Sequence, residues 1–439
     1  MHILNNRRQL AVGQGFFHVG DVRDDAGFRL RYVVDCGAMS KYAAARNARI
    51  DEYIAETGHG EAIDLLFISH AHVDHVNGVA RLLEPSKGLK VKAIVMPLMS
   101  VTDRLIAFSR AASEDPAAAE DPFFRAFTVD PVGAVRGFGP DRILLVDGRN
   151  RDGGAPFRNG PDDGPRPDDG PRPDDESKER LDHNLIPAWE FVGRGRMERW
   201  KPGPGEDTGK GVEVMPDTRG FLTSARGSSL SWLLAPYVDP SVTARAGEFM
   251  AQLAEERKQS VRALKAWLRS TANRLKLLTE SAADLRAAYG AVHEDLNVTS
   301  LCLYSGPARE LPKARLYHAR LGSAHVKPSV NDEGGGAWLG TGDAALAHAK
   351  RRGDFFAHYG QLLSQVTTMT LPHHGSDHNF HAELLEQVQP RWCVAPADRF
   401  STWRHPGSRV CQAVASTGRF VSVVTSDSRS QVSELVGIM

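Results

Sequence analysis

Several features that would assign this chain to a special class of protein are missing from its sequence. No run of about 18 apolar residues could span a bilayer, and the first residues, MHILNNRRQLAVGQGFF, lack the apolar core of a secretory signal. The 54 Lys and Arg residues are balanced by 54 Asp and Glu residues, which argues against a surface that coats nucleic acid nonspecifically. We therefore expect a cytoplasmic protein without a membrane segment, in which a small basic cleft could still exist.

Cysteine is also scarce. The 439 residues include four cysteines, Cys36, Cys302, Cys393 and Cys411, which are widely separated and form no CxxC pair. This spacing favours neither a disulfide framework nor a cysteine-rich zinc knuckle, and it favours a reducing compartment. A chain of this length can bury a substantial core, so we expect one large domain with elaborations.

The apolar segments that are present alternate with turns and helical patterns. FRLRYVVDCG, IDLLFISH and VKAIVMP have the composition of buried strands, and NGVARLLEPSKG has that of a helix. This alternation predicts a layered α/β domain. The pattern stops near residue 148 and returns near residue 298, so residues 1–148 and 293–439 are predicted to be two halves of one domain.

Residues 149–215 are predicted to be an insertion without regular structure. The stretch GPDDGPRPDDGPRPDD repeats a six-residue unit rich in Pro, Gly and Asp, which buries little and has no helix or strand periodicity. A solvated spacer is the favoured interpretation, although the acidic repeats could bind a basic partner.

Residues 216–292 are predicted to contain a strand and then a long helical insertion. Between Ala244 and Tyr289 apolar side chains recur at three- and four-residue spacings, and Gly290 is a natural stop. The stretch is too long for one ordinary helix, so we expect a helical hairpin. A packing role is favoured over a lid or a surface that binds a partner.

A cluster of metal-binding residue types follows the predicted strand IDLLF. In FISHAHVDHVNG, His70 and His72 are two residues apart, so on an extended strand end their rings leave on the same side. Asp74 and His75 follow the break of the strand and can turn towards a second position about 3.5 to 4 Å away, the separation of two-metal hydrolytic sites. Imidazole and carboxylate ligands without thiolate suit zinc and leave manganese or iron open. The segment therefore predicts two divalent metal ions, zinc foremost, with Mn²⁺ as an alternative.

HAHVDH also matches the HxHxDH signature of the metallo-β-lactamase superfamily, and further motifs follow in that family's order. YVVDCG resembles the motif in which an Asp at a strand end supports the metal loop, which would be Asp35. GTGD resembles the motif whose Asp bridges both metals, which would be Asp343. LPHHGS resembles the closing histidine motif, so His373 or His374 would be a ligand. The resemblance implies an αββα sandwich, with the sequence halves packed face to face and a metal cleft along one edge.

The chain resembles in particular the soluble domain of the bacterial DNA-uptake channel family. The VGQG, TGD, HHGS and late GHP motifs of that family have counterparts here in VGQG, TGD, HHGS and RHP. The resemblance covers about residues 9–100 and 293–430 and excludes the insertions. One departure is Phe16, because that family usually has an Asp directly after VGQG. The likeness implies cleavage of a phosphodiester in DNA, RNA or a nucleotide.

The resemblance also implies how the ligands are shared. His70, His72 and His293 would bind one ion, Asp74, His75 and His373 would bind the other, and Asp343 would lie between them. His293 has the spacing of the third superfamily motif, but it could instead be an isolated histidine at a helix end. Relatives that end in His-x-Gly-Thr favour His373, whereas those with Pro-Gly-His-Gly favour His374. The other ring would support the site or contact the substrate.

Further residues are predicted around the metals. His405, in the RHP motif, could donate a proton to the leaving oxygen or bind phosphate, or it could lie in a surface turn. Arginines outnumber acidic residues between positions 391 and 419, which favours an anionic substrate. Arg404 and Ser376 are the predicted substrate contacts.

These features together predict a binuclear metal-dependent hydrolase. Two cations would lower the pKa of a water molecule held between them, so that it becomes hydroxide near neutral pH, with Asp74 and His405 as the catalytic side chains. An anionic phosphodiester is the favoured substrate, although lactones, thioesters and β-lactams are cleaved elsewhere in the superfamily. The lack of an export signal argues against a β-lactamase. The alternative outside enzymes is a metal-stabilised partner protein of a multi-gene bacterial defence system, in which the helical insertion recruits partners.

Overall fold

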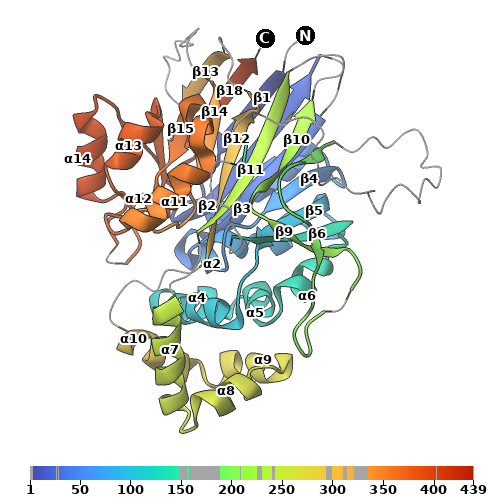
Figure 1. Ribbon diagram of the computed structural model, residues 1–439, viewed down its shortest axis with the longest axis vertical. Helices are drawn as coiled ribbons and strands as arrows, with labels where there is room; N and C mark the ends of the chain where they lie inside the picture. Colours follow the sequence, from blue (N-terminus) through green and yellow to red (C-terminus); the bar gives the residue numbers. More distant parts are fainter. Residues whose placement is uncertain are drawn as a thin grey trace, which may run out of the picture.

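The computed structural model describes most of the chain and has a mixed α/β architecture. The described residues are 3–25, 27, 29–148, 156–157, 188–207, 209–224, 230–239, 243–292, 299–309, 314–320, 335–401 and 403–438. Two mixed β-sheets pack against each other, and helices cover the outer face of each (Figure 1). The predicted α/β class is confirmed at this level.

The first sheet has ten strands within the described residues. In spatial order they are β13 (Ala314–Arg320), β18 (Val432–Ile438), β1 (Ile3–Gln9), β2 (Gly15–Asp24), β3 (Arg29–Ala38), β4 (Ala62–Phe67), β5 (Lys90–Pro97), β6 (Arg142–Asp147), β9 (Val212–Pro216) and β8 (Glu198–Arg199). Strands β3, β4, β5, β6 and β9 run parallel to their neighbours in this series. Parallel strands are covered on both faces, which explains why every residue of β4 after Ala62 is buried.

The second sheet has eight strands within the described residues. In spatial order they are β17 (Val421–Val424), β16 (Trp392–Pro396), β15 (Val366–Thr370), β14 (Ala337–Gly340), β12 (Ser300–Pro307), β11 (Ser231–Asp239), β10 (Arg219–Ser224) and β7 (Glu190–Gly193). Strands β14 to β17 are parallel, so β14 and β15 end at the same edge.

The two sheets do not correspond to the two halves of the sequence, as the expectation of halves packed face to face required. β13 and β18 come from the C-terminal part of the chain, yet they join the first sheet through β1. Consequently the two ends of the chain lie side by side in Figure 1.

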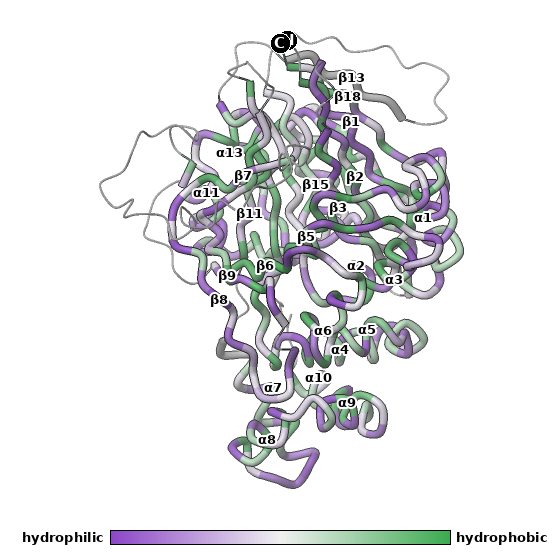
Figure 2. The backbone as a smooth tube through the Cα atoms, turned by 90° about the vertical axis from the view of Figure 1, so that its right-hand side faces the viewer, coloured by the Kyte–Doolittle hydropathy of each residue, from purple (hydrophilic) through white to green (hydrophobic). Residues whose placement is uncertain are grey.

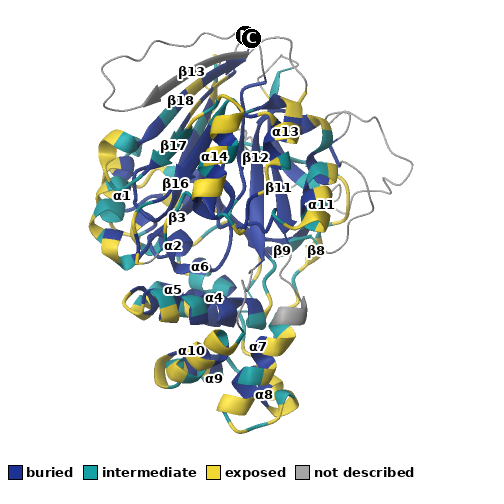
Figure 3. Ribbon diagram, turned by 90° about the vertical axis from the view of Figure 1, so that its left-hand side faces the viewer, coloured by how far each residue is buried: buried dark blue, intermediate teal, exposed yellow. Residues whose placement is uncertain are grey.

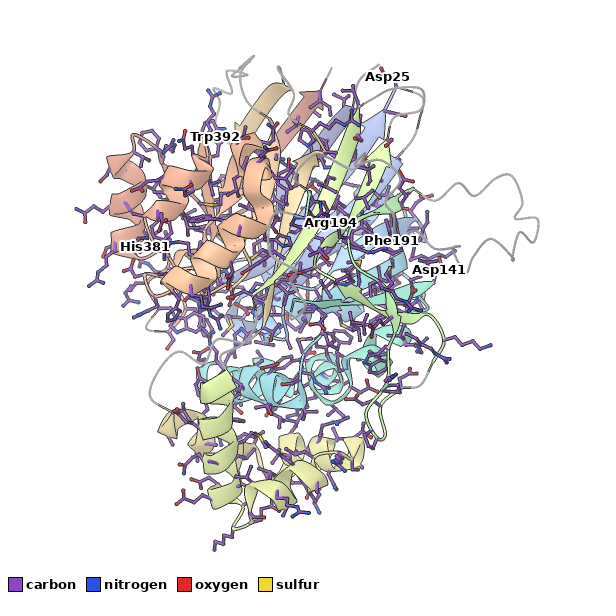
Figure 4. The ribbon with its side chains drawn as sticks, viewed as in Figure 1. Asp25, Asp141, Phe191, Arg194, His381 and Trp392 are labelled. Carbon is purple, nitrogen blue, oxygen red and sulfur yellow. The ribbon has the colours of Figure 1, made fainter. Side chains whose placement is uncertain are left out.

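An apolar core joins the sheets. The rings of Phe67 in β4 and Phe221 in β10 meet edge to face with centroids 5.6 Å apart, and burying a side chain of this kind contributes about 1.5–3 kcal/mol. Figure 2 shows hydrophobic stretches around β6 and β11 in the middle of the molecule, whereas β1 is largely hydrophilic. Figure 4 shows Asp141, directly before β6, close to Phe191 of β7, where the Cζ of Arg142 lies 5.8 Å from the Phe191 ring centroid. The sheets are therefore in contact at this edge as well.

A buried ion pair of the first sheet forms hydrogen bonds with the second sheet. Arg7 of β1 and Glu434 of β18 have 0% and 3% of their side chains exposed, and Arg7 Nε donates to Glu434 Oε2 at 2.8 Å. Arg7 Nη1 donates to the carbonyl oxygen of Gly336, directly before β14, and the hydroxyl of Thr368 in β15 donates to Glu434. We refer to these four residues as the Arg7 cluster.

Helices form the outer layers. The first sheet is covered by α1 (Ala43–Thr57), α2 (Val73–Val76), α3 (Val79–Leu82), α4 (Val101–Glu114), α5 (Pro122–Val129) and α6 (Pro131–Arg136), and the second by α11 (Ala349–Tyr359), α12 (Pro372–Gly375), α13 (Glu383–Val388) and α14 (Ser408–Ser416). Short 3₁₀ turns occur at Ser40–Tyr42, Ala118–Glu120, Gly360–Gln365 and Ser428–Ser430. None of the helices in the described ranges combines the length and apolar character needed to cross a membrane.

The predicted helical hairpin is instead a group of four helices, α7 (Thr243–Glu256), α8 (Val261–Trp267), α9 (Thr271–Glu280) and α10 (Ala282–Ala291). The hydroxyls of Ser260 and Ser270 accept hydrogen bonds from backbone N–H groups and begin α8 and α9, which divides the helical stretch. Buried leucines, among them Leu253 and Leu277, pack the group onto the first helical layer. In Figure 3 it lies below α4 and α5 with exposed residues on its outer side.

The predicted unstructured insertion extends too far in the C-terminal direction. Its acidic repeat lies outside the described residues, but the chain from residue 188 onward contributes β7, β8 and β9. Val212 and Met215 of β9 are buried, because β9 pairs in parallel with β6 inside the first sheet.

Candidate metal centre

The HAHVDH segment lies at the edge where β3 and β4 end. These two strands are parallel neighbours, and Asp35 lies near the end of β3. The chain leaves β4 through a short loop and enters α2, which carries Asp74 and His75. α2 lies directly against β3, because a Cβ atom at Gly37 would be only 2.5 Å from the carbonyl carbon of Asp74. Glycine at this position permits the approach.

The second sheet supplies residues from the ends of β14 and β15. Asp343 follows β14, and His373 and His374 follow β15. The N–H of Leu301 in β12 donates to the carbonyl oxygen of Ser69 in the metal loop at 2.8 Å. This hydrogen bond holds the two groups of residues at one edge of the sandwich.

Two sets of buried side chains could each hold a metal ion. The first is His70, His75 and Asp343, and the second is Asp74, His75 and His374, with the ligand atoms of each set within 4.8 Å of one another. Asp343 Oδ2 is 3.3 Å from His70 Nε2. Its Oδ1 is 3.6 Å from His75 Nε2 and 4.0 Å from His374 Nε2. Asp343 therefore reaches ligand atoms of both sets. We refer to these five residues as the metal cluster.

Asp35 fixes the orientation of two of the histidines. Its carboxylate accepts hydrogen bonds from the N–H and the hydroxyl of Ser69, each at 2.6 Å, and from His75 Nδ1 at 2.7 Å. Because a carboxylate only accepts, Nδ1 of His75 carries the hydrogen and Nε2 carries the lone pair. The Ser69 hydroxyl in turn accepts from His70 Nδ1 at 2.9 Å. Both Nε2 lone pairs are thereby directed at Asp343.

His374 is oriented in the same way. Its Nδ1 donates to the carbonyl oxygen of Pro396 at 2.7 Å, which leaves the lone pair on Nε2. That atom is 3.2 Å from Asp74 Oδ2. His374 therefore has the orientation that a metal ligand needs.

His373 has a different environment, although its Nε2 is only 3.5 Å from Asp343 Oδ2. Its Nδ1 donates to Asn379 Oδ1 at 2.9 Å, and its Nε2 accepts from Arg110 Nη2 at 2.9 Å. Burial lowers the pKa of His373 well below its ordinary value; Asp343 opposes this effect and Arg110 adds to it. Since both of its nitrogens are already paired, this geometry favours His374 over His373 as the ligand.

His72 belongs to neither set. Its Nδ1 contacts Asp74 Oδ1, and its Nε2 is 3.9 Å from Glu114 Oε2. The His70 and His72 rings are parallel with centroids 6.2 Å apart. The sharing of one ion by these two rings stays a prediction.

Unpaired polar atoms identify the chemistry that this cluster can accommodate. The buried atoms without a hydrogen-bond partner among the described residues include Nε2 of His70, His72, His75 and His374 and Oδ1 of Asp343. Each such atom costs about 1–3 kcal/mol, and all five are acceptors or can become acceptors. Imidazole nitrogen and carboxylate oxygen are the donor atoms that zinc takes. The residues therefore fit a divalent metal ion.

Backbone strain is concentrated at the same place. Asp35, His373 and His374 have φ values of 55°, 51° and 57°, and they are three of the six described residues other than glycine with positive φ. Such conformations cost of order 1–3 kcal/mol each and cluster at functional sites. The strain lets neighbouring residues in LPHHGS direct their rings at different partners.

Two shifted pKa values bear on the predicted catalytic side chains. Burial alone would raise the pKa of Asp74, but its electrostatic interactions with His72 and His75 hold it well below its ordinary value. Burial lowers the pKa of His405 to about 4, and the charges of His374 and Arg110 act in the same direction. At neutral pH Asp74 is therefore an ionised carboxylate and His405 a neutral imidazole.

The other predicted residues have these positions. His293 lies outside the described residues. His405 is near His373, with ring centroids 5.8 Å apart. Arg404 is exposed and donates to the carbonyl oxygen of Trp403 at 3.2 Å, and Ser376 is buried and accepts from the N–H of residue 378 at 3.2 Å. Their roles towards a substrate stay predictions.

Sequence reasoning missed two residues of α4 that contact this site. Arg110 donates to His373, and Glu114 lies between Arg110 and His72. Their four-residue spacing is that of an ordinary ion pair on a helix surface. No signal in the sequence distinguishes them from such a pair.

Neither a comparison of the chain with protein-family models nor a comparison with curated proteins finds a match. The likeness to a known superfamily therefore rests on the motifs quoted above.

Proposed function

We propose that this protein is a metal-dependent phosphodiesterase of the metallo-β-lactamase type, and that its two-sheet sandwich is the αββα fold of that superfamily. One observation carries the proposal: buried Nε2 and Oδ1 atoms from both sheets face one another without hydrogen-bond partners among the described residues. The order of the HAHVDH, GTGD and LPHHGS motifs supports the same function.

Two divalent ions, zinc foremost and Mn²⁺ as the alternative, would be held by residues of both sheets. One would bind His70, with His72 and His293 as the motif resemblance implies, the other would bind Asp74, His75 and His374, and Asp343 would contact both. When bound, such a pair supplies Lewis acidity and lowers the pKa of water.

The residues of the chain position these groups and the substrate. Asp35 and Ser69 hold the His70 and His75 rings with their lone pairs inward. The neutral His405 ring would donate a hydrogen bond to an anionic oxygen of the phosphodiester, because a group with a pKa of about 4 retains no extra proton to release at neutral pH.

Metal content and hydrolysis test the proposal together. The purified protein is loaded with Zn²⁺ or Mn²⁺, its metal is quantified, and single-stranded DNA, RNA and bis(p-nitrophenyl) phosphate are offered as substrates. We expect about two ions per chain, and hydrolysis of at least one substrate that Asp74→Ala abolishes. The matched control is Asp51→Asn, which removes an exposed carboxylate of α1 and should leave both unchanged. Equal residual signals from Asp74→Ala and the unaltered protein on every substrate would contradict the proposal.

A further inference from the structure

Arg110 of α4 lies beside the metal cluster without belonging to either set of possible ligands. Its Nη2 donates to His373 Nε2 at 2.9 Å, and its Nε donates to Glu114 Oε2 at 3.0 Å. Its Cζ is 5.6 Å from the ring centroid of Trp403. Contacts on three sides hold the guanidinium group in one orientation.

Part of this guanidinium group is available to a ligand. An arginine has five N–H donors, and Arg110 uses one on Glu114 and one on His373. Its Nη1 has no acceptor among the described residues, and it is not among the buried atoms that lack a partner. With 14% of the side chain exposed, unused donors of Arg110 can be reached from solvent.

The packing of α4 explains why this charge is fixed at the site. α4 contacts α2, which carries Asp74 and His75, on one side and α10 and α7 on the other. The carboxylates of Glu114, Asp343 and Asp74 act electrostatically on Arg110 and favour its charged form. The group of four helices therefore supports the wall of the site that bears Arg110.

We propose that Arg110 is a substrate-binding residue, whose free N–H donors bind an anionic oxygen of the phosphodiester while the Trp403 ring forms the adjoining apolar wall. The inference rests on the proposed function, because it names the residue that recognises the charge of that substrate. A planar guanidinium group held by neighbours loses little entropy when it binds a phosphate oxygen.

Binding without turnover tests this assignment. Affinities of the metal-loaded protein are measured by calorimetry for a phosphorothioate-linked dinucleotide, which is charged and resists hydrolysis, and for the uncharged methylphosphonate analogue. Arg110→Gln should weaken binding of the charged dinucleotide by about 10- to 100-fold, the range for a hydrogen bond to a charged group, and should hardly change binding of the neutral one. Arg110→Lys should restore part of the difference.

Controls separate recognition from damage to the site. Arg81→Gln removes an exposed arginine that pairs with Asp51 and should leave both affinities unchanged. The metal content of Arg110→Gln should equal that of the unaltered protein. Loss of affinity for both dinucleotides to the same degree, loss of metal, or no change in either affinity would overturn the assignment of Arg110.

The outcome is independent of the test of hydrolysis. If the unaltered protein discriminates between the two dinucleotides through Arg110 but cleaves no phosphodiester, the proposed hydrolysis fails and the anion site stands. If the unaltered protein cleaves phosphodiesters and Arg110→Gln still binds the charged dinucleotide in preference to the neutral one as the unaltered protein does, the proposed function stands and this inference fails.

Discussion

The Arg7 cluster and the metal cluster are both polar groups buried where the two sheets meet, but their atoms are matched in opposite ways. In the Arg7 cluster, guanidinium and hydroxyl donors face a carboxylate and a carbonyl oxygen. In the metal cluster, imidazole lone pairs face carboxylate oxygens. Arg7 Nη2 lacks a partner among the described residues, but it is a donor and cannot bind a cation. Burial of polar groups therefore does not mark a site by itself; several unmatched imidazole and carboxylate acceptors that face one another do.

The largest expected effect is a loss of stability when the Arg7 cluster is altered. Glu434→Leu leaves the charge of Arg7 buried and unpaired, so we expect the free energy of unfolding to fall by about 3–5 kcal/mol while metal content is retained. Urea unfolding of the protein measures the loss. The double variant Arg7→Met with Glu434→Leu should recover much of it, and failure to recover would mean that the pair is not the cause.

Asp343→Asn should have a large effect on metal affinity and a small effect on stability. This substitution removes the carboxylate that reaches both sets of ligands. We expect metal affinity to fall by more than about 100-fold, which is the upper limit for a residue that only orients a ligand. The metal-free protein should lose less stability than it does with Glu434→Leu, because one oxygen of this carboxylate has no hydrogen-bond partner among the described residues. Chelator competition and urea unfolding check the two statements. If Asp343→Asn lowered the free energy of unfolding as much as Glu434→Leu does, the two clusters would not differ in the way proposed here.

Asp35→Asn should lower metal affinity by less than Asp343→Asn does. Asp35 touches His75 and Ser69 and is a supporting residue outside both ligand sets. We expect metal affinity to fall by about 10- to 100-fold, the usual range for a partner that orients a ligand. The same chelator competition gives the value, and an affinity equal to that of the unaltered protein would remove Asp35 from the site.

The smallest effect is expected for a surface pair. Asp51 and Arg81 are about half exposed, with Asp51 Oδ2 2.7 Å from Arg81 Nη2, and their hydrogen bond lowers the pKa of Asp51. Because the folded pKa lies below the unfolded one, the stabilisation is present above the unfolded value of about 3.9 and is lost as pH falls through the folded pKa. Asp51→Asn should therefore cost at most about 1 kcal/mol near neutral pH and less in acid, as measured by urea unfolding at both pH values.

The sequence could predict those features that depend on residues close together in the chain. His70, His72, Asp74 and His75 are consecutive enough for their spacing to indicate a metal site, and the α/β class follows from the apolar periodicity. The choice between His373 and His374 depends on positive φ values and on Pro396 and Arg110, which no local pattern contains.

The helical stretch was misjudged for a related reason. Its three- and four-residue spacing predicted helix correctly, but Ser260 and Ser270 each begin a new helix through a single hydrogen bond. Arg110 could not be recognised, because its role depends on α4 packing between α2 and α10. Contacts of this kind arise only when distant segments fold together.

The hydrogen bond from Leu301 to Ser69 couples the halves of the metal cluster and has a consequence for biosynthesis. On the ribosome, HAHVDH emerges long before β14 and β15 exist, so a nascent chain has only an incomplete set of ligands. Tight capture of an ion must await the late strands, because a site that is assembled by folding binds metal only once folded. Under the proposed function, loading with metal is postponed until β14 and β15 have been translated, and a polypeptide terminated before them should compete poorly for the cell's metal.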